Sequence, residues 1–431
     1  MKRGTEGTAL TRRKALAATA AVLAAGSLTT GCGGARPGTD GTITLHLQGT
    51  PQDQPLYARL LPDFTARHRG VRVQVSTAAT AKPAVPVAGV VAGAGPDVLW
   101  GNDPVPYLAQ PLLADLTPWI GRGGYDLQAF GANVLAAFRR GGSLFMLPRS
   151  LSPQAYAVRL DRLTAAHLQP PAAGTTAAEF STMWARLSSG GRVGGALDWR
   201  PTSSFYLRGW GAHLVDPGNP RRCALGTAAA IACGRWMWDQ FWSCGCAQGP
   251  FGPNRTARFA TGGLAMRLVS AAGIVGFAAA HQPIRWRLTP FPRWPAGPAT
   301  GALVDFYGMS AATPHPHAAW ALLTYITSAG WQQAAIHAAR VPPARRSLWG
   351  AFATRIAQAA PPLAHQPLSA FSAPVEADVA YPQETFADQA PATAVLTPLW
   401  AEMFGPNAKL SVRQGFPLAA TRIDAAEAPR T

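Results

Sequence analysis

The 431-residue chain is short of charge, and above all of lysine. Only 14% of its residues are charged, with 21 acidic residues against 38 basic ones, and the only lysines are Lys2, Lys14, Lys82 and Lys409. A formal net charge of +17 is a property that could favour nucleic acid or anionic lipid as a partner. The arginines are scattered, however, without a run of five like charges or a nucleic-acid-binding motif. We therefore expect no nucleic-acid partner.

A second feature that the sequence lacks is an apolar run long enough to cross a membrane. The run Ala15–Leu28 has 14 residues, whereas a spanning helix needs about 20. It follows Arg12, Arg13 and Lys14 and ends in small residues, which is the order of a secretory signal peptide. Residues 1–31 are therefore left out of the fold prediction.

The end of this segment, Leu28-Thr29-Thr30-Gly31-Cys32, resembles a bacterial lipoprotein signal, in which the Cys32 thiol is acylated. An ordinary signal peptide with an incidental cysteine is the alternative. Thr11-Arg12-Arg13 also resembles a twin-arginine signal, so the export route stays open. Residues 32–41 are small and polar, as in a flexible tether. We expect an exported protein that a lipid holds to the outer face of the cytoplasmic membrane.

Cysteine is scarce in the remainder of the chain. The four residues Cys223, Cys233, Cys244 and Cys246 are an even set, which predicts disulfides in an oxidising compartment. Of the three possible pairings, we favour one in which Cys223 and Cys233 each bridge to the turn that holds Cys244 and Cys246. A direct bond within that turn would be the most strained. A zinc site is the alternative.

The sequence also lacks the common signatures of catalysis. It has no Gly-x-Ser-x-Gly, no His-Glu-x-x-His and no phosphate-binding loop. His315 and His317 flank a proline after Thr313-Pro314, a pattern more typical of a helix start than of a metal site. We predict a protein that is not an enzyme and has no cofactor or metal, with a secreted carbohydrate-active enzyme as the alternative.

The patterning that is present indicates an α/β protein. Residues 42–47 and 71–75 alternate as strands do, and the apolar residues between them recur at helical spacing, which predicts a β-α-β unit. A short strand ending at Trp100 precedes the loop Gly101-Asn102-Asp103, and ligands bind at such loops in open α/β sheets. The 400 residues after the signal exceed the chain length that a single hydrophobic core normally stabilises, so we expect two domains.

Several segments resemble, in order, landmarks of the extracellular solute-binding proteins of ABC importers, in the carbohydrate-type group that includes maltose-binding protein. They are GAGPDVLWGND, ADLTPWI, GGSLFMLPRSLSPQAYAVRL, GLAMRLVSAAG, HPHAAWALLTYITSAGWQQAA and RVPPARRSLW. The resemblance implies a two-lobe fold of the periplasmic-binding-protein type II class, with the ligand in a cleft between the lobes. It also implies a permease as partner and capture of a small solute without turnover. A receptor lipoprotein that kept this fold without transport is a further alternative.

The same resemblance divides the chain into lobes. Lobe one is expected at 41–150 plus 298–340, and lobe two at 151–297 plus 341–431. Proline-rich stretches at 148–153, 283–298 and 342–343 support chain crossings there. We expect a monomer that closes around its ligand.

A sugar cleft needs flat aromatic faces for C–H surfaces and planar polar groups for hydroxyls. Most of the 14 tryptophans, including Trp236, Trp238, Trp242, Trp320 and Trp331 on two expected helices, are assigned to the core. The candidate ligand-binding residues lie in the first lobe, at the crossings and in a second-lobe loop: Gln48, Trp100, Asn102, Asp103, Arg149, Ser152, Asp198, Trp199, Arg200, Asp305 and Tyr307.

One departure from the family pattern leaves the ligand class open. Many relatives carry a sugar-stacking tryptophan where this chain has Ser270-Ala271-Ala272-Gly273. The resemblance is thus compatible with a smaller sugar, an oligosaccharide stacked elsewhere, a polyol phosphate or a peptide.

Overall fold

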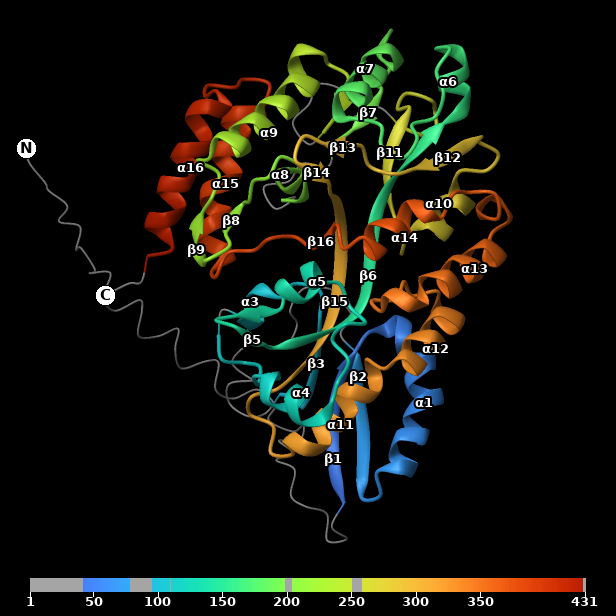
Figure 1. Ribbon diagram of the computed structural model, residues 1–431, viewed down its shortest axis with the longest axis vertical. Coiled ribbons are helices and arrows are strands. Elements are labelled where there is room, and N and C mark those ends of the chain that lie inside the picture. Colours follow the sequence, from blue (N-terminus) through green and yellow to red (C-terminus); the bar gives the residue numbers. More distant parts are fainter. Residues whose placement is uncertain (1–41, 78–94, 109, 198–203, 250–257, 429–431) are drawn as a thin grey trace, which may run out of the picture.

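The computed structural model describes residues 42–77, 95–108, 110–197, 204–249 and 258–428. The chain forms two lobes stacked along the long axis of the molecule (Figure 1). The lobes share a curled eight-stranded sheet, whose main path has the order β11-β6-β15-β3-β1-β2. The fold is therefore mixed α/β with two lobes, as predicted.

The first lobe begins with the predicted β-α-β unit. Strands β1 (Ile43–Gly49) and β2 (Val71–Thr77) are parallel, and helix α1 (Gln54–Arg67) connects them. The helix buries Leu56, Tyr57, Leu61 and Phe64, which recur at the spacing of one helix face. Strand β3 (Val98–Gly101) pairs with β1 on the other side, so that the ends of β1 and β3 meet at the sheet edge nearest the second lobe (Figure 1).

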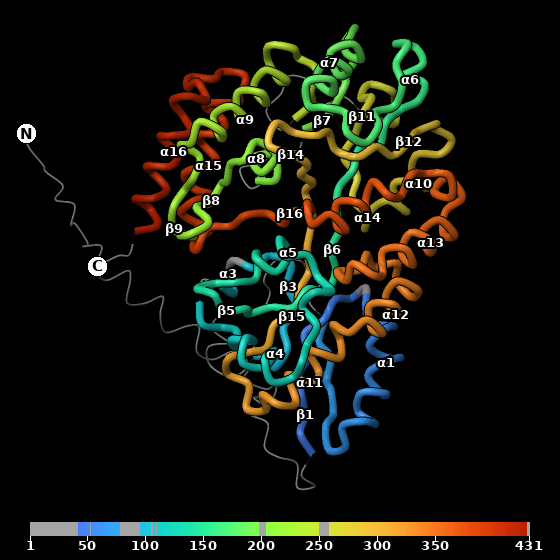
Figure 2. The backbone as a smooth tube through the Cα atoms, viewed as in Figure 1, coloured from blue at the N-terminus to red at the C-terminus, as the bar shows by residue number. Residues whose placement is uncertain are grey.

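Two long antiparallel strands carry the chain between the lobes. Strands β6 (Met146–Arg159) and β15 (Thr300–Met309) pair with each other from Ala302 to Gly308. In the second lobe, β11 (Met266–Ser270) and β12 (Trp286–Thr289) pair with β6. Both strands belong to one sheet, and Figure 2 shows them as continuous tubes through the waist of the molecule. Strand β6 contains the proline-rich stretch 148–153, whereas β15 begins after the stretch 283–298.

Helices and short strands complete each lobe. On the first-lobe side are α3 (Val105–Leu108), α4 (Thr117–Gly123), α5 (Ala132–Ala136), β4 (Arg139–Arg140), β5 (Ser143–Leu144), α11 (Pro316–Ile326), α12 (Ala329–Ala339), α13 (Trp349–Ala359) and α14 (Ser369–Glu376). On the second-lobe side are α6 (Leu160–Ala165), α7 (Ala177–Leu187), β7 (Gly195–Ala196), α8 (Phe205–Gly209), β8 (Val215–Asp216), β9 (Asn219–Cys223), α9 (Ala228–Trp238), η2 (Asp239–Ser243), β10 (Ala247–Gln248), α10 (Ile274–Ala280), β13 (Arg293–Trp294), β14 (Gly297–Pro298), α15 (Gln389–Phe404) and α16 (Val412–Ala426).

The last passage between the lobes involves residues that we placed in the second lobe. Of these, Trp349, Phe352 and Phe371 belong to the core that also contains β1 and β3. That core includes Phe277 of α10 and Trp286 of β12 as well, so core membership alone does not assign a residue to a lobe. The chain then passes through β16 (Ala380–Tyr381), and the second core takes it up again at Phe386. The predicted lobe boundaries stay a prediction.

Helix α11 begins at Pro316, so that His315 and His317 lie at a helix start, as predicted. Thr313 is not the residue that caps this helix. Its hydroxyl accepts the backbone N–H of His315, and His315 is the residue that directly precedes the helix. Trp331 lies on the separate helix α12, whose cap Ser328 accepts the Trp331 N–H. Within the described ranges there is no group of three or more His, Cys, Asp or Glu side chains placed to hold a metal.

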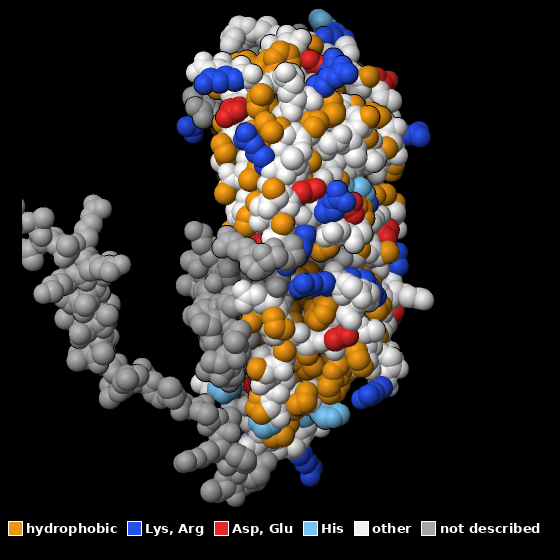
Figure 3. Space-filling view, turned by 90° about the vertical axis from the view of Figure 1, so that its left-hand side faces the viewer, with side chains coloured by type: hydrophobic (Ala, Val, Ile, Leu, Met, Phe, Trp, Pro, Cys, Tyr) orange, Lys and Arg blue, Asp and Glu red, His pale blue; other side chains and the backbone are white. Residues whose placement is uncertain are grey.

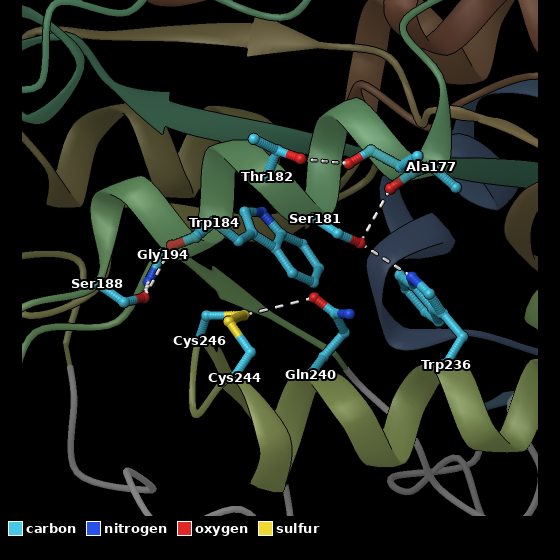
Figure 4. Close-up of a disulfide and its surroundings, with 11 residues drawn as sticks. Ala177, Ser181, Thr182, Trp184, Ser188, Gly194, Trp236, Gln240, Cys244 and Cys246 are labelled. Atoms are coloured by element: carbon cyan, nitrogen blue, oxygen red, sulfur yellow. Dashed lines mark hydrogen bonds between the residues drawn. A yellow bond between two sulfur atoms is a disulfide. The ribbon is translucent and has the colours of Figure 1, made fainter.

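The predicted disulfide pairing is wrong. Cys244 and Cys246 are bonded to each other, whereas Cys223 and Cys233 are free and buried (Figure 4). Gly245 adopts φ +63°, a left-handed conformation that glycine allows, and the turn sets the two Cα atoms 5.1 Å apart, within the range for a disulfide. Cys233 instead packs on the buried side of α9.

We expect two free thiols in the Cys32→Ser protein after denaturation, and almost no reaction of these thiols in the native protein. Burial raises the pKa of the Cys223 thiol to about 12 and raises that of Cys233 as well, so the reactive thiolate is scarce in the fold. A colorimetric thiol titration with and without denaturant measures both counts. A count of zero in denaturant would show that Cys223 and Cys233 are also disulfide-bonded, and a count of four would exclude any disulfide.

None of the helices in the described ranges combines the length and the apolar character that a membrane span requires.

Candidate functional site

A buried charge cluster lies where the crossing strands leave the first lobe. On β6, Ser150 pairs with Asp305 and Pro148 with Phe306, so Arg149 is an extra residue in a β-bulge. Bulges re-aim side chains, and here Arg149 reaches two carboxylates. Its Nη2 lies 2.5 Å from Asp53 Oδ2, and its Nη1 lies 2.8 Å from Asp305 Oδ2.

Arg149 is 6% exposed and Asp53 is fully buried, so the charges of this cluster compensate each other away from water. Burial alone would lower the pKa of Arg149, but Asp53 and the neighbouring acidic groups raise it, and the guanidinium stays charged. Burial also raises the pKa of Asp305, while Arg149 and the Ser150 hydroxyl, 2.9 Å away, act in the opposite direction.

Two tyrosines extend the cluster into the first lobe. The hydroxyls of Tyr57 and Tyr307 are 2.7 Å apart, and Tyr57 donates to Asp53 at 3.4 Å. Burial raises the pKa of both phenols, which therefore stay protonated. This network ties α1 to the crossing strands and fixes the bulge.

The crossing strands present a mixed polar and apolar surface beside this cluster. Leu303 lies opposite Ser152, and Asp305 opposite Ser150, so these side chains share one face of the β6–β15 pair. Leu303 is 59% exposed, and no other large apolar side chain in the described part of the chain is exposed in this way. We call Leu303, Asp305 and Gln154 the crossing surface.

The opposite face of the same strands is closed. Leu151 and Val304 alternate with the crossing surface and belong to the first core, and α14 packs against β6. Gln154 lies on the same face as Leu303, because a Cβ at Gly301, two positions before Leu303, would come within 2.8 Å of its Oε1. That oxygen is buried without a hydrogen-bond partner among the described residues. The crossing surface thus combines the exposed Leu303 with the partly buried carboxylate of Asp305 and a buried amide oxygen.

Tyr381 connects the crossing surface to a cavity between the lobes. It is the register partner of Gly301 on β15 and lines a cavity of about 670 Å³, a volume typical of small-molecule sites. The other lining residues come from α3, α5 and β4 of the first lobe, from α8, β8 and β9 of the second, and from residues 381–387. Figure 1 shows these elements facing each other on the left of the molecule.

The segment that carries Tyr381 is anchored to both lobes by carboxylates. Asp378 accepts the backbone N–H groups of Ala132 and Asn133 at the start of α5. Glu384 accepts those of Leu214 and Val215 in the second lobe, at 2.6 and 3.1 Å. We call residues 378–384 the strap.

The strap also positions a cation over an aromatic ring. The Arg208 guanidinium lies 4.7 Å from the centre of the Tyr381 ring, an arrangement with favourable cation–π attraction. Arg208 is also 3.6 Å from Glu384, which contacts His213 at 2.8 Å. Tyr381 and Arg208 are therefore held as a unit on the cavity wall.

The structure brings some of the predicted site residues together. Arg149, Asp305 and Tyr307 share the buried cluster, and Trp100 is the register partner of Tyr307 on β3. Two further polar atoms there, Trp100 Nε1 and Gln48 Oε1, are buried without a hydrogen-bond partner in the described part.

Other predicted residues are placed differently. The Ser152 hydroxyl accepts the backbone N–H of Ala272, which is a structural contact. Asn102 is exposed, and Asp103 lies near Tyr107, where burial and the Asp103 charge raise the tyrosine pKa. Cys32 and the second-lobe candidates Asp198, Trp199 and Arg200 lie outside the described residues.

None of the predicted residues within the described ranges lines the 670 Å³ cavity, so sequence reasoning missed this wall of the site. Tyr381 and Glu384 stand in one segment and Arg208 in another, and neither segment carries a local motif. Leu303 carried only a weak signal, since it is an apolar residue two positions before Asp305 in a strand that the sequence assigned to the first lobe.

Comparison with known families matches residues 60–390 to a family described as bacterial extracellular solute-binding protein. No curated protein sequence matches the chain. Solved structures share the fold at low identity. The sugar-binding protein MalE from Xanthomonas citri is 17% identical, with a TM-score of 0.73 over 90% of this chain and 98% of its own.

Two further structures are similar over a comparable length. The cyclic alpha-maltosyl-1,6-maltose binding protein from Arthrobacter globiformis is 17% identical, with a TM-score of 0.71 over 90% of this chain and 99% of its own. UgpB from Mycobacterium tuberculosis, in complex with glycerophosphocholine, is 17% identical, with a TM-score of 0.65 and the same coverage.

Proposed function

Because this chain belongs to the bacterial extracellular solute-binding proteins, we propose that its cleft captures a sugar or short oligosaccharide and delivers it to the permease of an ABC importer. The crossing surface is the observation that supports this proposal. An exposed Leu303 lies on one face of the crossing strands with the carboxylate of Asp305, and Gln154 on the same face has a buried Oε1 without a hydrogen-bond partner in the described part. Sugars present apolar C–H faces and hydroxyls together, and such a surface matches both.

The similar structures support a carbohydrate without deciding which one. MalE is a sugar-binding protein, and the Arthrobacter protein binds a cyclic maltosyl-maltose. UgpB is complexed with glycerophosphocholine, so the same fold also accommodates a polyol phosphate ester. The proposal therefore places a polyol or sugar moiety on the crossing surface.

The mechanism is capture by closure rather than turnover. The lobes are joined by β6, β15 and the strap, and a ligand that touches both lobes favours the closed arrangement by its higher affinity for it. The closed form is then the state that the permease recognises. The protein acts as a monomer and needs no cofactor for this cycle.

A thermal-shift screen of mono- and oligosaccharides, polyols and sugar phosphates tests the proposed function. A solute that binds only the folded protein stabilises it by about 2.7 kcal/mol at a concentration 100 times its Kd. The same mixtures are assayed for product formation. If a product forms and Asp305→Asn abolishes its formation, the protein is an enzyme rather than a binding protein. The absence of any stabilising solute would contradict solute capture in this cleft.

Export and anchoring follow from the N-terminal segment. We expect Cys32→Ser to move the protein from the membrane fraction to the soluble exported fraction, because a thiol at that position accepts the lipid. Detergent phase partitioning of the wild-type and variant proteins measures the change. Membrane association that persists without the thiol would refute lipidation as the anchor.

A further inference from the structure

The cavity between the lobes has an excess of positive charge. Arg139, Arg140, Arg208 and Arg221 line it, against the two carboxylates of Asp216 and Glu384. Arg221 also pairs with Glu427 at 3.8 Å, so the excess rests on Arg139 and Arg140. Figure 3, which faces this side of the molecule, shows basic and acidic side chains next to each other at mid-height, where the lobes meet. A cavity of one predominant charge focuses the field on an opposite charge that enters it.

Both lining carboxylates are already occupied by partners within the fold. Glu384 accepts two backbone N–H groups and contacts Arg208 and His213. Asp216 accepts the backbone N–H groups of Gly218 and Asn219 at 2.8 and 3.1 Å. No ion pair in the described part of the chain joins either carboxylate to Arg139 or Arg140 of the first lobe.

Arg139 and Arg140 stand on the opposite wall, on strand β4. Arg139 donates to the carbonyl of Gly142 at 2.9 Å, and Arg140 donates to the carbonyl of Leu108. Neither forms an ion pair with a carboxylate of the described chain. A guanidinium has five N–H donors, so each of these side chains keeps donors that one carbonyl contact does not use. Both are exposed to the solvent that fills the cavity.

We propose that the arginine-lined end of this cavity binds an anionic group, a phosphate or a carboxylate, on the captured solute. The inference rests on the proposed function and narrows the solute to an acidic sugar or polyol derivative. The planar guanidinium fork pairs with both kinds of oxyanion through parallel N–H···O bonds. Because Arg139 and Arg140 belong to the first lobe and Arg208 to the second, an anion held from both sides also favours closure.

Isothermal titration calorimetry with matched probes tests this inference. The probes are glucose, glucose 6-phosphate, glucuronate and inorganic phosphate, at about 150 mM salt, where exposed long-range attraction is screened. We expect glucose 6-phosphate or glucuronate to bind about ten-fold tighter than glucose. The charged probe that binds better distinguishes a phosphate from a carboxylate site.

The double variant R139Q/R140Q should lose this preference, so that it binds the charged probes no tighter than glucose. The control R122Q/R413Q removes two exposed arginines outside the cavity and should behave as the wild type. Equal binding of neutral and charged sugars, or an unchanged preference in R139Q/R140Q, would overturn the anion site but not solute capture. Binding of inorganic phosphate alone, lost in R139Q/R140Q, would keep the anion site and contradict the sugar proposal. Binding of no probe would contradict both.

Discussion

Replacement of Arg149 by Met is expected to lower the free energy of unfolding by about 3–5 kcal/mol. The substitution leaves Asp53, which is fully buried, without the guanidinium 2.5 Å from its carboxylate. Met is shorter but has a similar side-chain volume, so the loss reports mainly the missing charge rather than a large cavity. Urea denaturation followed by circular dichroism measures the change.

Two controls separate this effect from a general loss of arginine. Arg222→Met removes an exposed pair with Asp424 at 3.4 Å and should change stability by less than about 1 kcal/mol. Asp53→Asn combined with Arg149→Met removes both charges and should recover part of the loss. An Arg149→Met protein as stable as the wild type would show that the cluster is not what holds the crossing strands to α1.

Replacement of Tyr381 by Ala is expected to weaken binding of the solute found in the screen by about ten- to one-hundred-fold, as removal of a central aromatic contact does. Tyr381 lies between the crossing surface and the cavity, and its ring also supports Arg208. Tyr381→Phe keeps the ring and should retain binding within about three-fold. Calorimetric titration measures the affinities.

Thermal unfolding of both Tyr381 variants shows whether the strap still holds. Its anchors at Asp378 and Glu384 bond to backbone groups that the substitution does not touch, so the melting temperatures should remain close to that of the wild type. If a folded Tyr381→Ala protein bound the solute with full affinity, Tyr381 would not be part of the binding site.

The parts of the fold that the sequence predicts well are those with strong local periodicity. The β-α-β unit follows from alternating strands and from Leu56, Leu61 and Phe64 on one helix face. The position of Arg149 at a crossing also came from the sequence, through resemblance and flanking prolines. Its bulge did not, because pairing register depends on the partner strand β15, more than a hundred residues away in the chain.

The errors have identifiable physical causes. The third crossing was placed at two prolines, but Trp349 and Phe371, which follow them, join the core that also contains β1 and β3, and membership of a core is a long-range property. The predicted cysteine pairing is wrong because Gly245, in a left-handed conformation, allows Cys244 and Cys246 to bond to each other across one residue. Cys233 is a free cysteine on α9. The cavity wall at Tyr381 and Arg208 joins two separate segments, and local spacing cannot reveal that.

The central claim is that a solute bound between the lobes closes them, and small-angle X-ray scattering of the protein with and without the solute found in the screen tests it most directly. The account predicts that the radius of gyration decreases on addition of solute, saturates with the calorimetric affinity, and stays unchanged in Tyr381→Ala at the same solute concentration. A solute that binds tightly at full occupancy and leaves the scattering profile of the wild type unchanged would contradict capture by closure.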